Sequence, residues 1–87
     1  MYLIITYDIE VERVNKVLKV CRKYLNWVQN SVLEGEINKA QLKRLKSELA
    51  HVIDDEKDSV TFYKLRTTRY FEKETMGITK GAEELIL

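Results

Sequence analysis

Two helical stripes of apolar residues, each flanked by short β-rich runs, constrain the fold of this chain most strongly. In the first stripe, from about Glu12 to Leu25, apolar side chains recur at intervals of three and four residues, the period of one helix face. Its members are Val14, Val17, Leu18, Cys21 and Leu25. The second stripe consists of Leu42, Leu45, Leu49, Val52 and Ile53. It starts near Asn38, with Gln41 three residues later as in a capping box.

The β-rich runs supply a sheet for these helices. We expect strands over residues 2–7, 27–37, 58–65 and 69–76, the last ending in a break at Gly77. The second run is long enough to bend into a hairpin, at Asn30-Ser31 or at Glu34-Gly35, and the sequence leaves both open. The resulting order is the βαββαβ pattern of an α+β, ferredoxin-like fold, followed by an extra C-terminal strand.

The length of 87 residues corresponds to a single domain spanning 1–87. A chain this short buries only about 60–65% of its unfolded surface, so a homodimer would add the apolar burial that one copy lacks. The ending Leu85-Ile86-Leu87 favours docking onto another chain. No run approaches the ~18 apolar residues of a membrane span, and the start lacks a basic leader. We therefore expect no membrane segment and, by default, a cytoplasmic location.

Basic residues are concentrated on the first predicted helix, although the net charge is only +1. The cluster consists of Arg13, Lys16, Lys19, Arg22 and Lys23, with no acidic residue among them. Such a face binds phosphates without reading base sequence, and an ordinary solvated helix face is the alternative. Arg66 and Arg69 would extend this surface. The polarised charge predicts nucleic acid, DNA or RNA, as a partner.

Several short motifs, taken in order, resemble the CRISPR-associated Cas-two family. They are Tyr7-Asp8-Ile9, the basic helix from Arg13, Tyr24-Leu25, Val28-Gln29-Asn30-Ser31-Val32-Leu33-Glu34-Gly35, Asp58-Ser59-Val60 and Tyr63-Lys64-Leu65. Together they cover roughly residues 2 to 65, and their order and spacing carry the resemblance.

The resemblance implies a homodimer whose sheets face each other, with the segment at about 78–87 exchanged onto the partner. It also implies a role in spacer acquisition, in which the dimer and the Cas-one integrase hold DNA before insertion. Members of the family are described as magnesium-dependent endoribonucleases or deoxyribonucleases, and the aspartate that ligates the metal would be Asp8 here. Tyr7 and Ser31 would support this site.

Asp8 has two interpretations. One aspartate is a poor Mg²⁺ site, because this ion prefers octahedral oxygen ligation. A two-fold axis would bring a second Asp8 opposite the first, and a cation between them would relieve their repulsion. Alternatively, Asp8 only caps the turn over residues 9–13.

The remaining chemistry-bearing residues favour structural roles. Cys21 is the single cysteine and is expected to be buried. His51 lies on the second helix without an identifiable acid partner, so a surface or half-buried position is expected. Two rival functions stay open: a non-catalytic scaffold that holds DNA, and a toxin-like ribonuclease on a related fold.

Overall fold

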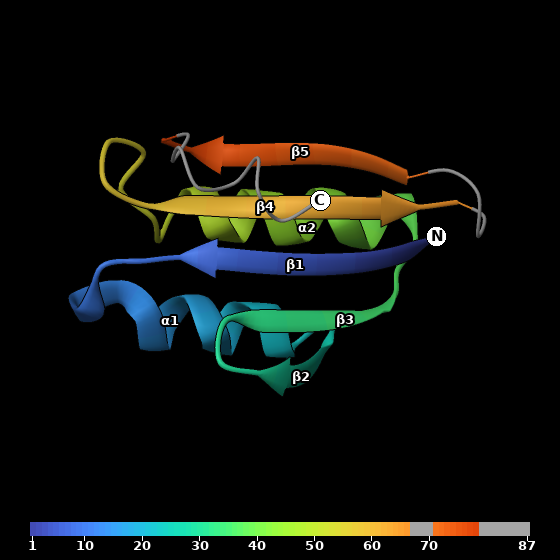
Figure 1. Ribbon diagram of the computed structural model, residues 1–87, viewed down its shortest axis with the longest axis horizontal. Coiled ribbons are helices and arrows are strands. Elements are labelled where there is room, and N and C mark those ends of the chain that lie inside the picture. Colours follow the sequence, from blue (N-terminus) through green and yellow to red (C-terminus); the bar gives the residue numbers. More distant parts are fainter. Residues whose placement is uncertain (67–70, 79–87) are drawn as a thin grey trace.

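Five antiparallel strands form one sheet in the order β2-β3-β1-β4-β5. The computed structural model describes residues 1–66 and 71–78. The elements are β1 (Tyr2–Asp8), α1 (Val11–Arg22), β2 (Asn26–Gln29), β3 (Val32–Glu36), α2 (Lys39–Ala50), β4 (Ser59–Leu65) and β5 (Phe71–Gly77). Both helices lie on the same side of the sheet (Figure 1). The predicted α+β ferredoxin-like fold with an extra strand is confirmed.

The central strand β1 alternates between the two faces of the sheet. Leu3, Ile5 and Tyr7 are buried in the core beneath the helices. Because successive strand residues point to opposite faces, Thr6 and Asp8 lie on the face that no described helix covers. This alternation fixes where the predicted site residues point.

The first helix is shorter than predicted. It begins at Val11 and ends at Arg22, whereas the apolar stripe continues to Leu25. Leu25 is nevertheless buried, and its amide donates to the carbonyl of Cys21 (2.9 Å). The chain keeps turning beyond the helix, so the apolar spacing overstates its length. Cys21 is fully buried, as predicted.

The hairpin turn lies at Asn30-Ser31, the first of the two positions that the sequence left open. Asn30 has φ +39°, a conformation that asparagine tolerates better than most residues. Leu33 is buried, whereas Val28 is about half exposed because β2 is an edge strand.

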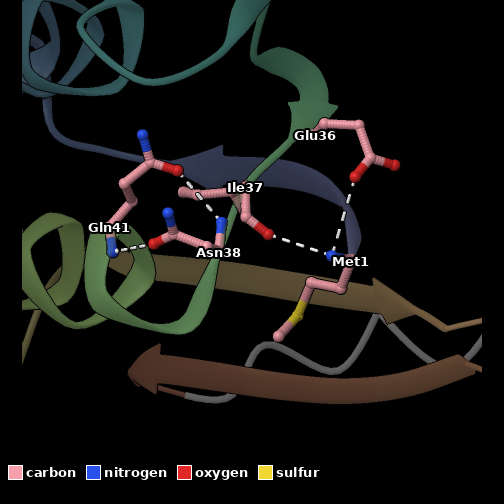
Figure 2. Close-up of a pocket in the computed structure, with 5 residues that line it drawn as sticks. All are labelled: Met1, Glu36, Ile37, Asn38 and Gln41. Carbon is pink, nitrogen blue, oxygen red and sulfur yellow. Dashed lines mark hydrogen bonds and ion pairs between the residues drawn. The ribbon is translucent and has the colours of Figure 1, made fainter.

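The second helix starts with the predicted capping box. The Asn38 side chain accepts from the Gln41 amide (2.7 Å), and the Gln41 side chain accepts from the Asn38 amide (3.0 Å; Figure 2). The helix ends at Ala50, so the prediction that it includes Val52 and Ile53 is wrong. Both amides still donate to the carbonyl of Leu49, which keeps the side chains against the core.

The last two strands differ slightly from their predicted limits. β4 begins at Ser59, one residue later than predicted, because Asp58 is engaged in side-chain contacts. β5 includes Gly77, which was predicted to break it. Arg69 and the segment 79–87, including the Leu85–Leu87 tip, lie outside the described residues.

Candidate functional site

Asp8 occupies the last position of β1 and is exposed. It pairs in register with Ser59 of β4, so both residues lie on the sheet face opposite the helices. The strand ends here because the chain must leave the sheet to start α1 at Val11. A carboxylate is thus presented to solvent on a rigid central strand.

The loop that follows Asp8 is held by the buried carboxylate of Asp58. Asp58 is 0% exposed and accepts from the Glu10 amide (2.9 Å) and the Asp54 amide (2.8 Å). Arg13 donates to both carboxylate oxygens, through Nε (2.6 Å) and Nη2 (3.0 Å). The Arg13 guanidinium, helped by these amides, holds the pKa of Asp58 far below its usual range.

Arg13 therefore has a different environment from the other predicted phosphate ligands. Its guanidinium is bound to Asp58, and its side chain is only 19% exposed. Asp58 raises the pKa of Arg13, so the pair stays charged. The sequence did not reveal this pair, since Asp58 follows an acidic turn and its partner is 45 residues away. The available signal was an acid placed directly before an apolar strand.

Tyr7 and Ser31 lie close to Asp8 in the chain fold. The Tyr7 ring is part of the core, and burial raises its pKa. Its amide donates to the carbonyl of Ser31 (3.2 Å), which places the hairpin turn next to the end of β1. Both residues therefore shape the position of Asp8 through the backbone.

The rest of the basic cluster lies on the exposed face of α1. Lys16, Lys19 and Arg22 are exposed, and no described carboxylate forms an ion pair with them. Lys23 is also exposed, but its ammonium pairs with Glu48 of α2 (2.5 Å). We call Lys16, Lys19, Arg22 and Lys23 the α1 basic stripe.

The structure separates the α1 basic stripe from Asp8. The stripe lies on the outer surface of a helix, whereas Asp8 lies on the opposite face of the sheet.

Arg66, predicted to extend the basic surface, is exposed after β4 and pairs with Glu72 (3.4 Å). A separate pocket lies next to the amino group of Met1, and none of the residues that line it belongs to the predicted site (Figure 2). Met1 donates there to the carbonyl of Ile37 (3.0 Å).

The described residues of a single chain show no ready-made metal cluster. Within residues 1–66 and 71–78, no three His, Cys, Asp or Glu side chains are grouped to hold a metal ion. Asp8 supplies carboxylate oxygen, the ligand type that Mg²⁺ prefers, and this ion keeps several waters. A second carboxylate from another copy of the chain would give Mg²⁺ a fuller set of the oxygen ligands it prefers.

The family of the chain follows from comparison with known proteins. The family model described as "CRISPR associated protein Cas2" matches residues 1–73. The chain belongs to the Cas2 family. This confirms the family expected from the motifs around Asp8 and the hairpin.

Cas2 relatives match along the whole chain. A protein of Dictyoglomus turgidum named CRISPR-associated endoribonuclease Cas2 is 53% identical over 87 residues, covering 100% of both chains. A protein of the same name from Pyrococcus furiosus is 51% identical, also over 100% of both. A solved structure described as the crystal structure of cas2 aligns with a TM-score of 0.74 and 43% identity, covering 93% of this chain and 91% of the other.

Neither helix in the described part of the chain is long and apolar enough to span a bilayer.

Proposed function

We propose that this Cas2-family chain is an endoribonuclease that acts as a homodimer, with one Asp8 from each copy flanking a Mg²⁺ ion. The observation that carries the proposal is the position of Asp8, exposed at the end of the central strand on the face opposite the helices. The relatives named endoribonucleases, which match the chain throughout, support it.

The second copy completes the site in this proposal. A two-fold contact between the sheet faces opposite the helices would place one Asp8 opposite the other. Two facing carboxylates repel, and a divalent cation offsets that repulsion. Bound Mg²⁺ would polarise a phosphoryl oxygen of the RNA or activate the attacking water. The protein holds the two carboxylates on rigid strands, with the loop after each of them fixed by Asp58.

Nucleic acid is held by the α1 basic stripe in the same proposal. Lys16, Lys19 and Arg22 are exposed and not neutralised by described acids, so they contact phosphates through charge. The Cas2 family relationship supports a place in spacer acquisition. In that role the dimer holds DNA together with the Cas-one integrase.

The separation of the basic stripe from Asp8 favours one rival function, a DNA-holding scaffold without catalysis. A duplex lying on α1 does not need the carboxylate on the other face of the sheet. In the scaffold, Asp8 has no part in chemistry, and the loop after it is held by Asp58.

One experiment separates these two functions. End-labelled single-stranded RNA and duplex DNA are incubated with Mg²⁺ and either the native chain, Asp8→Asn or the exposed-loop control Asp55→Asn. Each protein is checked for dimerisation. We expect the native chain and Asp55→Asn to cut RNA, and Asp8→Asn to lose at least about 100-fold of the rate.

Two results would contradict the endoribonuclease. Equal cutting by Asp8→Asn removes Asp8 from the chemistry. Binding of duplex DNA by all three proteins, with no cutting by any of them, establishes the scaffold instead.

A further inference from the structure

Trp27 is the only tryptophan of the chain and lies on the edge strand β2 with 49% of its surface exposed. We propose that Trp27 and Arg22 form a stacking subsite that holds one unpaired nucleobase of single-stranded RNA or DNA. The inference rests on the proposed nucleic-acid binding and adds a site for the base to the phosphate contacts of α1.

The Trp27 ring is held in a fixed orientation. Its Nε1 donates to the carbonyl of Asn30 in the hairpin turn (2.9 Å). The only polar group of the indole is thus satisfied within the hairpin, and what remains exposed is aromatic surface. A ring that is already fixed loses little conformational freedom when a base stacks on it.

Arg22 brings a cation to this ring. Its guanidinium carbon lies 5.6 Å from the centre of the Trp27 ring, within the range of a cation–π contact. Guanidinium groups stack on planar rings and also bind phosphate. Arg22 therefore connects the aromatic surface of β2 with the α1 basic stripe, at a point where helix and hairpin meet.

Charge complementarity identifies the occupant as a polyanion. Lys19 and Lys16 precede Arg22 on α1 at intervals of three residues, each nearly one helical turn. No described carboxylate pairs with any of the three. An apolar protein segment would bury these cations without a partner, at a high desolvation cost. A nucleic-acid strand neutralises them with successive phosphates.

The aromatic surface further selects a single strand. Bases inside a duplex are already stacked on each other, whereas unpaired bases can be splayed onto aromatic side chains. Stacking of this kind tolerates any base, because every base has a π face. The subsite therefore predicts a preference for single-stranded over duplex nucleic acid, without strong sequence preference.

The single tryptophan makes the inference directly measurable. The probe is a fluorescein-labelled 12-nucleotide oligouridylate, added at low salt in EDTA so that no cleavage occurs. Fluorescence anisotropy of the label measures binding, and Trp27 emission, recorded with the unlabelled strand, measures contact with the ring. An abasic strand of the same length supplies phosphates without bases. A duplex of that length supplies bases that are already stacked on each other.

We expect oligouridylate to quench Trp27 emission as it binds, and the abasic strand and the duplex to bind with little quenching. Trp27→Leu should weaken oligouridylate binding about 5- to 100-fold, the range of one stacked base. Its affinity for the abasic strand should stay unchanged. Trp27→Phe, which keeps an aromatic face, should bind between the two. The matched control is Val28→Ala, a neighbouring residue with similar exposure, which should leave binding unchanged.

The results that overturn the inference differ from those that overturn the proposed function. If oligouridylate binds without quenching, and Trp27→Leu binds as tightly as the native chain, the stacking subsite is refuted while nucleic-acid binding stands. Equal quenching by the abasic strand also refutes it, as does an equal loss in Val28→Ala. If no strand binds even at low salt, the nucleic-acid function itself fails and the subsite with it.

Discussion

Asp58 contacts three separate segments of the chain: the loop after β1, the start of α1 and the residue after β5. Its carboxylate holds the loop after β1 through Glu10 and the start of α1 through Arg13. Its carbonyl accepts from the Ile78 amide beyond β5 (3.0 Å). The fit is close, because a Cβ added at Gly77, which has φ +90°, would lie 1.9 Å from that carbonyl oxygen. The geometry around Asp8 therefore depends on one buried carboxylate.

Replacing Asp58 by asparagine should destabilise the fold in a pH-dependent way. At pH 7 the change removes the buried charge that Arg13 pairs with and leaves the exposed Glu12 as its one ion-pair partner among the described residues, and we expect the free energy of unfolding to fall by about 3 kcal/mol. The lowered pKa of Asp58 means that its contribution is complete above about pH 4, the ordinary aspartate range. That contribution is lost as the pH falls toward the lowered value. Urea unfolding at pH 7, 5 and 3 should thus show a difference in unfolding free energy between the native chain and Asp58→Asn that narrows only at pH 3.

The control for this comparison is Asp55→Asn, in the exposed loop before Asp58. Its unfolding free energy should stay within about 0.5 kcal/mol of the native chain at every pH. If the difference in unfolding free energy between the native chain and Asp58→Asn is constant from pH 7 to pH 3, the charge of Asp58 is not what stabilises the loop.

The Cys21 thiol should be unreactive in the folded protein. It is fully buried on α1, and burial raises its pKa to about 12. Because the thiolate is the reacting form, an aromatic disulfide reagent at pH 8 should label native protein at least about 1,000-fold more slowly than protein in urea. The absorbance of the released thiolate follows the reaction. Similar rates in both conditions would mean that α1 opens from the sheet easily.

At the scale of elements, local signals predicted most of the structure. The capping box at Asn38 and the apolar periods located both helices, and the turn residues limited the hairpin to two positions. Periodicity failed where turns continue past a helix end, at Leu25, Val52 and Ile53, because a residue in such a turn keeps the spacing of the stripe. The sequence contains no local signal that distinguishes these turns from another helical turn.

The capping box should contribute measurably to stability. Asn38→Ala removes the side chain that accepts from the Gln41 amide, leaving one donor of the first turn unsatisfied. We expect the free energy of unfolding to fall by about 1 kcal/mol in urea titrations. Lys43→Ala, exposed in the middle of the same helix, is the control and should change it little. Equal losses in the two variants would assign the effect to helix content alone.

At the scale of the whole molecule, the candidate site was predicted in its parts but not in its arrangement. Asp8 and most of the basic cluster are exposed, as a metal ligand and a phosphate-binding face require. The diversion of Arg13 to Asp58, and the cation–π contact between Arg22 and Trp27, depend on how distant elements pack. No spacing rule relates residues from a helix and from separate loops or strands, so only the folded chain reveals these pairs.

The salt dependence of nucleic-acid binding should report the α1 basic stripe. Replacing Lys16 and Lys19 together by glutamine removes two phosphate contacts in our proposal. For a single strand the slope of log affinity against log salt should then become shallower by about 1.4. Anisotropy titrations between 50 and 200 mM salt measure it. The matched control, Lys39→Gln with Lys43→Gln on α2, removes the same charge and should leave the slope unchanged; an equal effect would place the contacts elsewhere.

The central position of β1 also sets the order in which the sheet is completed during translation. Tyr2 pairs with Glu36 on one side and with Leu65 on the other, so β1 leaves the ribosome before both neighbours and can pair with β4 only after β3 and α2 have been made. At about 5–20 residues per second, the intervening stretch takes on the order of a few seconds to emerge. Until then one edge of β1 carries unpaired amides and carbonyls, which can pair with another nascent copy on the same messenger. Translation speed, rather than the intrinsic folding rate, thus determines how long this edge stays open.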